Sequence, residues 1–144
     1  MKNLILIFCF ISISSCGIIT DTEEDEYLYT YILTNETGVP IEITGGFERE
    51  TNIIANSGFF KCSFLASFSY AGGLCSGFVE IRIPNTNTGY RCYGLIDQVE
   101  GLCFVEDGRL FTRLEGTILT EISPRTYEYV LTPDLLENAY ELPD

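Results

Sequence analysis

From Tyr27 onward, hydrophobic and polar residues alternate with a period of two, which is typical of β-strands. In residues 27–34 the odd positions are Tyr, Tyr, Tyr and Leu, so they would share one face of a strand, and the β-branched and aromatic content favours a sheet. A turn-like sequence at 35–38 follows, and residues 41–44 alternate in the same way. The two segments predict an antiparallel hairpin, with Pro40 suited to the start of its second strand.

Further strands are indicated along the rest of the chain. The alternation returns at residues 79–83, 118–122 and 127–131. The clearest hairpin signal is Asp107-Gly108 between residues 102–106 and 109–113, because this dipeptide accepts the positive φ angles of a two-residue type I′ turn. One short helical signal follows the last strand, with Thr132 as N-cap, Pro133 at the first position and Asp134 in the first turn.

These elements predict an all-β domain over residues 27–144. About eight short strands separated by turn residues favour an antiparallel β-sandwich with a short C-terminal helix, and a small barrel is the alternative. One region is rich in aromatic residues, with Phe59, Phe60, Phe64, Phe68 and Tyr70. We expect it to form core, and an exposed binding face is the alternative.

The first fifteen residues have the order of a secretory signal peptide. Lys2 supplies a positive charge, residues 4–11 an apolar run, and residues 12–15 a small, polar end. The apolar run is about half as long as the roughly 20 residues that a transmembrane helix needs. We therefore expect residues 1–15 to be cleaved rather than retained as a membrane helix.

The sequence Ile13-Ser14-Ser15-Cys16 resembles the bacterial lipobox, which has an aliphatic residue, two small residues and a cysteine. The resemblance implies that a diacylglycerol is transferred to the sulfur of Cys16, that the leader is cut just before it, and that palmitate-type chains anchor the protein in the membrane. Two or three acyl chains would suffice, because each buried methylene contributes about 0.8 kcal/mol. An ordinary secreted protein with Cys16 in a disulfide is the alternative.

Residues 16–26 form a polar segment that ends in Glu23-Glu24-Asp25-Glu26, and we expect it to be a flexible tether. An acidic run at this place is similar to the export signal of Bacteroidota-type lipoproteins; a solvated linker is the alternative. With the Tyr-rich segment 27–38 and the closing segment 127–139, the mature chain resembles the small uncharacterised lipoproteins of such bacteria. That resemblance implies an outer-membrane location, periplasmic or surface-facing, and no particular activity.

The cysteines support export. Of six, Cys9 would leave with the leader and Cys16 would carry lipid, so an even number remains: Cys62, Cys75, Cys92 and Cys103. In an oxidising compartment these four can pair in three ways. The spacing favours neighbouring pairs, 62 with 75 and 92 with 103, each closing a short loop and adding about 2–4 kcal/mol. A catalytic or metal role is the weaker alternative, because no Cys-x-x-Cys motif and no histidine accompany them.

Charge and composition narrow the function classes. A net charge of −13 opposes binding to nucleic acids and electrostatic binding to anionic lipids. It is compatible with a cationic protein partner. The absence of histidine removes Ser/His/Asp and Cys/His mechanisms and nearly all catalytic zinc sites. No cofactor or metal is expected. The adjacent acids that remain for acid–base chemistry are Asp25/Glu26, Glu48/Glu50 and Glu106/Asp107.

Together these features predict a membrane-anchored, monomeric, non-enzymatic binding or envelope-interaction module. An acidic inhibitor of a cationic enzyme such as lysozyme is one alternative. A carboxylate-based hydrolase is the other, and it requires a concave pocket holding two acids about 5–10 Å apart.

The lipid anchor predicts the chemical state of the mature chain. Mass spectrometry of the purified native protein should find an acylated Cys16 as the first residue, and non-reducing digestion should identify the joined cysteines. An unmodified sulfur at Cys16, or a chain that still begins at Met1, would contradict the anchor.

Overall fold

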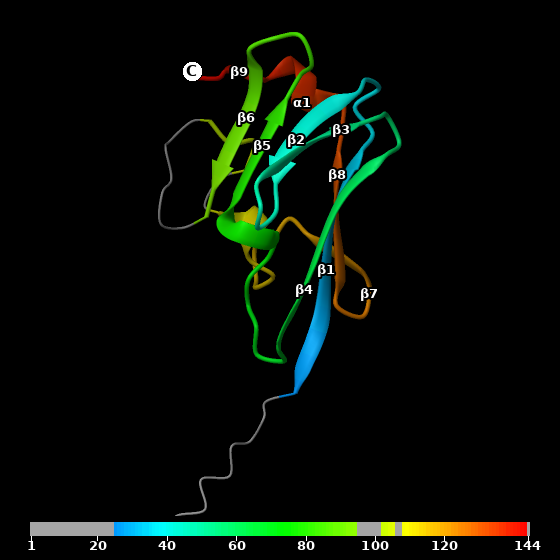
Figure 1. Ribbon diagram of the computed structural model, residues 1–144, viewed down its shortest axis with the longest axis vertical. Coiled ribbons are helices and arrows are strands. Elements are labelled where there is room, and N and C mark those ends of the chain that lie inside the picture. Colours follow the sequence, from blue (N-terminus) through cyan, green and yellow to red (C-terminus); the bar gives the residue numbers. More distant parts are fainter. Residues whose placement is uncertain (1–24, 95–101, 106–107, 144) are drawn as a thin grey trace, which may run out of the picture.

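A computed structural model describes residues 25–94, 102–105 and 108–143 as two packed β-sheets (Figure 1). The predicted leader, Cys16 and tether residues 16–24 lie outside the described residues. One sheet has the strand order β4-β1-β8-β7 and is called the β1 sheet; the other has the order β3-β2-β5-β6-β9 and is called the β2 sheet. The all-β sandwich predicted from the sequence is confirmed.

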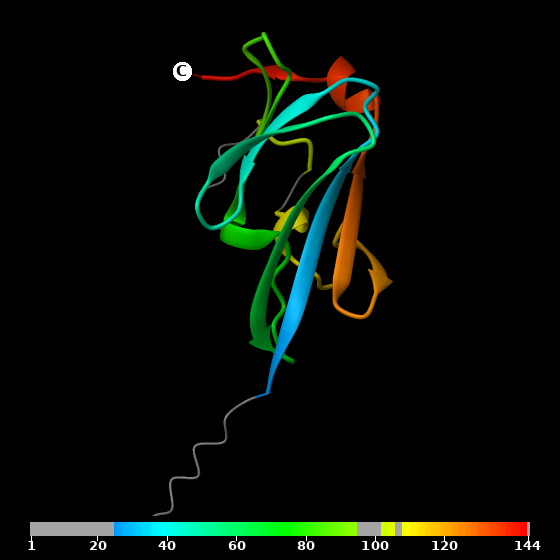
Figure 2. The ribbon, with the colours of Figure 1, turned by 45° about the vertical axis from the view of Figure 1, so that its right-hand side comes forward.

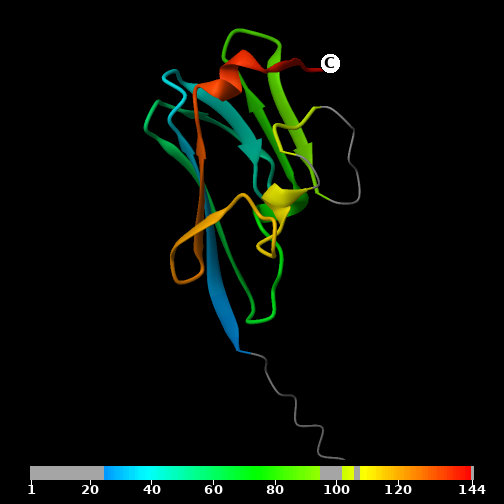
Figure 3. The same cartoon turned by 180° about the vertical axis from the view of Figure 1, so that it is seen from behind.

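Figure 3 shows the same elements from behind. They are β1 (Glu26–Asn35), β2 (Ile41–Gly45), β3 (Glu50–Ile54), β4 (Phe59–Ser67), the 3₁₀ turn η1 (Cys75–Gly77), β5 (Phe78–Arg82), β6 (Thr88–Tyr93), the 3₁₀ turn η2 (Arg109–Phe111), β7 (Thr120–Ser123), β8 (Thr126–Leu131), α1 (Asp134–Glu137) and β9 (Tyr140–Glu141).

Strand β1 is central to its sheet, between β4 and β8. Its pairing with β4 is antiparallel, but its pairing with β8 is parallel, whereas the other strand pairs are antiparallel. Tyr29, Tyr31 and Leu33 are buried, as the alternation predicts, and the side chains between them are more exposed. The sandwich therefore contains one mixed and one antiparallel sheet.

The core lies between the two sheets and is built largely from aromatic rings. The ring of Tyr31 stacks on those of Phe64 and Tyr127, with centroids 5.8 and 5.3 Å apart. The β2 sheet supplies aliphatic side chains, among them Ile41, Ile43, Val79 and Ile81. The burial of each of these side chains contributes about 1.5–3 kcal/mol to the stability of the fold. The hydroxyl of Tyr31 donates to the carbonyl of Gly72 at 2.8 Å, and burial raises the pKa of Tyr31 well above its usual value.

Asn35, at the end of β1, is fully buried and joins three segments. Its Nδ2 lies 2.8 Å from the carbonyl oxygen of Val39, 3.0 Å from that of Ile54 and 3.1 Å from that of Ala55. Its Oδ1 accepts from the backbone N–H and the hydroxyl of Thr37. The amide thus satisfies polar groups where the chain leaves one sheet for the other.

The predicted hairpin of residues 27–34 and 41–44 is wrong, because β1 and β2 lie in different sheets. The link 36–40 carries the chain across the sandwich, and the contacts of Asn35 fix that crossing. Pro40 does precede a strand, as expected. Both strands alternate correctly, since each turns one face to the same core.

The predicted hairpin around Asp107-Gly108 is also wrong. Asp107 lies outside the described residues, Gly108 has the expected positive φ of 63°, and η2 follows it instead of a strand. The flanking segments have other partners: Leu102 accepts from Arg91 of β6, and Leu110 accepts from Leu74. Contacts made far along the sequence therefore replace the local pairing.

Two smaller expectations need correction. The helix forms at Asp134–Glu137, but Pro133 is its N-cap and no side chain caps it, so Thr132 does not have the predicted role. The aromatic-rich region was expected to form core, and this holds for only part of it. Phe60 is buried, whereas Phe59 and Phe68 are 59% and 72% exposed.

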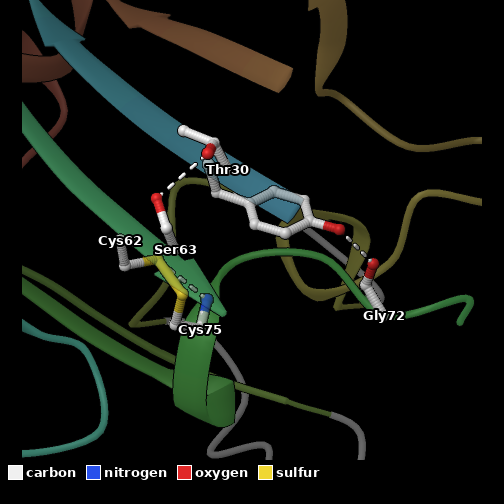
Figure 4. The surroundings of a disulfide bond; sticks show 6 residues. Thr30, Cys62, Ser63, Gly72 and Cys75 are labelled. Carbon is white, nitrogen blue, oxygen red and sulfur yellow. Dashed lines mark hydrogen bonds between the residues drawn. A yellow bond between two sulfur atoms is a disulfide. The ribbon is translucent and has the colours of Figure 1, made fainter. Parts of the chain in front are cut away.

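Both predicted disulfides are present, Cys62–Cys75 and Cys92–Cys103. Figure 4 shows the first, which ties β4 to the start of η1 beside a hydrogen bond between Thr30 and Ser63. The second ties the segment 102–105 to β6. Disulfides are typical of an oxidising, non-cytoplasmic compartment.

The role of Asn35 predicts a large loss of stability on its removal. Asn35→Ala removes all five hydrogen bonds of the buried amide. The carbonyls of Val39 and Ala55 keep a second donor, whereas the buried N–H of Thr37 loses its acceptor, and each buried group left unpaired costs about 1–3 kcal/mol. Urea unfolding should therefore show a decrease of about 3 kcal/mol or more in the free energy of unfolding. The control is Asn56→Ala, which removes one exposed hydrogen bond to Gly38 and should cost about 1 kcal/mol or less. Equal losses in the two variants would contradict the role given to Asn35.

Candidate functional site

Two edge strands, β3 and β4, lie along the same side of the sandwich (Figures 1 and 2). They belong to different sheets and follow each other in the chain, and within the described residues each is paired on one side only. An open cleft of about 470 Å³, here called the edge cleft, lies beside them. It is lined by Gly45, Gly46, Phe47, Glu48, Glu50, Asn52, Ile54, Phe59, Phe60, Lys61 and Cys62.

The register of the strands explains the base of the edge cleft. Glu50 of β3 lies opposite Gly45 of β2, and Asn52 lies opposite the buried Ile43, so both occupy positions on the inward-facing side of an edge strand. A Cβ atom at Gly45 would come within 3.3 Å of the ring of Phe60. Glycine therefore lets this buried ring pack directly against the β2 sheet and close the cleft from below.

The rim of the edge cleft combines apolar rings with charge. Phe47 and Phe59 are 63% and 59% exposed, and the Phe47 ring meets Phe64 edge-on at 5.7 Å. Glu48 and Glu50 are also exposed. Exposed aromatic rings beside carboxylates suit a ligand that carries both an apolar part and a positive charge.

The acid pairs singled out in the sequence have different positions. Glu48 and Glu50 line one cleft, as the hydrolase hypothesis requires, but both side chains are exposed to solvent. Glu26 begins β1, opposite Ser67, and does not line the edge cleft. The pair Glu106/Asp107 lies outside the described residues.

Sequence reasoning missed the other residues of the edge cleft. Phe47, Asn52 and Lys61 carry no motif, and the segment 50–54 has no clear alternation. Nothing local indicates that β3 and β4 are edge strands, since this depends on which strands pair. The exposed Phe59 was the one available signal, as part of the aromatic-rich region.

The outer face of the β2 sheet carries a compact ion-pair network. Glu80 of β5 binds Arg82 at 3.0 Å and Arg91 of β6 at 2.7 Å. Burial alone would raise the pKa of Glu80, but the hydrogen bonds and charges of the two guanidinium groups outweigh it, so the pKa lies below its usual value. The network engages two of the chain's eight basic residues, which share one carboxylate, away from the edge cleft.

Within residues 25–94, 102–105 and 108–143, no three His, Cys, Asp or Glu side chains come close enough together to hold a metal ion. No helix in these ranges has the length and apolar character required to cross a membrane.

Comparison of the chain with protein-family models, curated proteins and solved structures gave no match.

The lowered pKa of Glu80 predicts a pH-dependent contribution to stability. A carboxyl whose folded pKa is depressed stabilises the fold above its unfolded value, near 4.5, and this contribution is lost as pH falls through the folded pKa. Glu80→Gln should thus unfold at lower temperature than the native chain at pH 7, and the difference should narrow below about pH 4.5. Glu115→Gln, an exposed residue in a loop, is the control. A difference in melting temperature that is constant with pH would contradict the assignment.

Proposed function

We propose that this chain is a lipid-anchored envelope protein that binds an extended, positively charged polypeptide segment in its edge cleft, without catalysing a reaction. The protein would be held at the membrane by Cys16, and we place it in the bacterial outer membrane, facing the periplasm or the surface. The edge cleft is the observation that carries the proposal.

The anchor is supported by features that agree independently. The apolar leader, the lipobox-like Ile13-Ser14-Ser15-Cys16 and the acidic tether stand in the order typical of an exported lipoprotein. The disulfides Cys62–Cys75 and Cys92–Cys103 use the four cysteines that remain after Cys9 and Cys16 are assigned to the leader and the lipid. The remaining chain needs no membrane helix of its own.

The choice of a cationic ligand rests on charge. Glu48 and Glu50 line the cleft with one basic residue, Lys61, and the whole chain has a net charge of −13. A field of this sign accelerates the approach of a positive partner and repels anionic polymers. The exposed rings of Phe47 and Phe59 add apolar area and sites for cation–π contact.

The choice of an extended ligand rests on the strand edges. Because β3 and β4 are each paired on one side only, each presents backbone N–H and C=O groups along its outer edge. An extended segment can add to such an edge as a further strand, with alternate side chains directed into the neighbouring cleft. The backbone would supply affinity, and the acidic and aromatic rim would supply selectivity.

Binding is favoured over acid–base chemistry by the environment of the two acids. A general acid near neutral pH is usually a carboxyl group in a desolvated site, with a second carboxylate in a different environment. Glu48 and Glu50 are both exposed at the rim of an open cleft. Two similar, solvated carboxylates suit a cationic ligand better than a division into acid and base.

Inhibition of a cationic enzyme is a second candidate, and the acidic rim of the edge cleft favours it. A lysozyme is a suitable probe, since such an inhibitor should bind it at low salt, release it at moderate salt and reduce its activity. Binding without loss of lysozyme activity would favour the general binding module, and no salt-sensitive binding would remove the inhibitor.

The edge cleft predicts the effect of removing its charges. The double variant Glu48→Gln/Glu50→Gln should bind an alternating Lys-Thr octapeptide about two- to thirtyfold more weakly than the native chain, because each exposed ion pair contributes about 0.2–1 kcal/mol. Fluorescence anisotropy of a labelled peptide would measure this.

The matched control is Glu115→Gln/Glu137→Gln, which removes the same charge from exposed sites outside the cleft. If both double variants weaken binding equally, only the net charge matters. If the native chain does not bind the peptide at low salt, the proposed ligand class is wrong.

A further inference from the structure

A second pocket lies at the end of the sandwich where β1 begins, on the inner side of the β1 sheet. It measures about 250 Å³ and is lined by Tyr29, Phe68, Arg113, Glu121, Pro124, Arg125 and Tyr127. In Figure 1 this is the lower end, which also holds the end of β4 and the turn between β7 and β8. In a chain with 21 acidic and 8 basic residues, a small pocket with two arginines and one acid is unusual.

Arg113 is held in place by neutral groups. Its Nε donates to the carbonyl of Tyr70, and its NH2 donates to the carbonyl of Phe68 at 3.0 Å. The guanidinium lies 5.4 Å from the centre of the Tyr29 ring. These contacts orient the side chain of Arg113. They do not neutralise its positive charge, since no carboxylate of the described residues forms an ion pair with it.

Arg125 is held by a ring as well. Its guanidinium lies 4.2 Å from the centre of the Tyr27 ring. The one acid of the pocket, Glu121, accepts from the backbone N–H of Arg125 at 2.9 Å, and in the described part of the chain it forms no ion pair with either guanidinium. The carboxylate therefore supports the turn, and within the described residues no ion pair engages either guanidinium of the pocket.

The backbone of Arg125 has an unusual conformation for a residue other than glycine. The turn Pro124-Arg125 joins β7 to β8, and Arg125 has a φ of 59°, in the left-handed region. After proline in such a turn this position is usually glycine, because a side chain there is strained. Arg49, Ser57 and Asn85 also have a positive φ, but of these four residues only Arg125 lines the pocket that holds Arg113.

We propose that the pocket of Arg113 and Arg125 binds a phosphate group. The two guanidinium groups come from different segments, a loop before β7 and the β7–β8 turn, so they can approach an anion from two directions. A phosphate offers three acceptor oxygens to such a pair, whereas a carboxylate offers two. The rings of Tyr29, Tyr127 and Phe68 supply an apolar wall for the group that carries the phosphate. The inference is independent of the edge cleft and of the lipid anchor.

The test follows the arginine Nε–Hε signals by NMR while the purified full chain is titrated with inorganic phosphate at constant ionic strength. The signals of Arg113 and Arg125 should shift and saturate, and sodium acetate should act more weakly. Vesicles of phosphatidylglycerol and of a phosphate-free galactolipid distinguish the source. If inorganic phosphate binds and the phospholipid vesicles, but not the galactolipid vesicles, also shift the signals, the ligand is a lipid headgroup. If inorganic phosphate binds and neither kind of vesicle shifts the signals, the ligand is a soluble phosphate ester.

Arg125→Gly separates the function of this side chain from its structural effect. Glycine accepts the left-handed backbone, so the variant should melt at or above the native temperature, yet it should bind phosphate about tenfold more weakly or worse. Arg49→Gly is the matched control: Arg49 also has a positive φ, 53°, and its guanidinium lies over the Phe78 ring, outside this pocket. Its removal should leave phosphate binding unchanged.

Three results would overturn the proposal. These are the absence of saturable shifts with phosphate, tighter binding of acetate than of phosphate, and an equal loss of phosphate affinity in Arg49→Gly and Arg125→Gly.

Discussion

The buried amide of Asn35 is the contact on which the arrangement of the two sheets depends. Its side chain binds the carbonyls of Val39, Ile54 and Ala55, so it joins the crossing from β1 to β2 with the end of β3. Its backbone also pairs with residues 57 and 58, which lead into β4. A buried amide with all its partners is far more specific in position than apolar packing, because any displacement leaves a polar group unsatisfied. Asn35 thus holds the link between β3 and β4, the two strands that border the edge cleft.

Charge is distributed unevenly over this acidic fold. Of the basic residues, Arg82 and Arg91 share the carboxylate of Glu80 on the outer face of the β2 sheet, whereas Arg113 and Arg125 line a pocket with tyrosine rings. The edge cleft carries the opposite character, with two carboxylates and exposed phenyl rings. One small sandwich therefore offers two chemically distinct surfaces, one suited to a cationic segment and one to an anionic group. The negative net charge of the chain is consistent with the acidic edge cleft, but it gives no indication of the pocket that contains Arg113 and Arg125.

The sequence predicted those features that depend on neighbouring residues. The alternation of β1, β2, β5 and β8, the short helix and the pairing of the four cysteines follow from local pattern and spacing. The predicted hairpins failed because strand partners are chosen across the whole chain: β1 pairs in parallel with β8, and Leu110 bonds to Leu74 rather than to a neighbouring strand. The same limit applies to the sites. Glu48 and Glu50 were identified as adjacent acids, but the cleft that they line lies beside β3 and β4, which are edge strands of two different sheets. Which strands lie at an edge depends on pairing across the whole chain.

The position of β1 also has a mechanical consequence. This strand is bonded to β4 on one side and to β8 on the other, and the chain enters it at Glu26. Tension applied at that end runs along the strand axis, so it must shear two ladders of backbone hydrogen bonds at once instead of opening them one after another. A partner gripping β4 would pass its load straight into this central strand. The described domain should thus resist unfolding when tension is applied along β1.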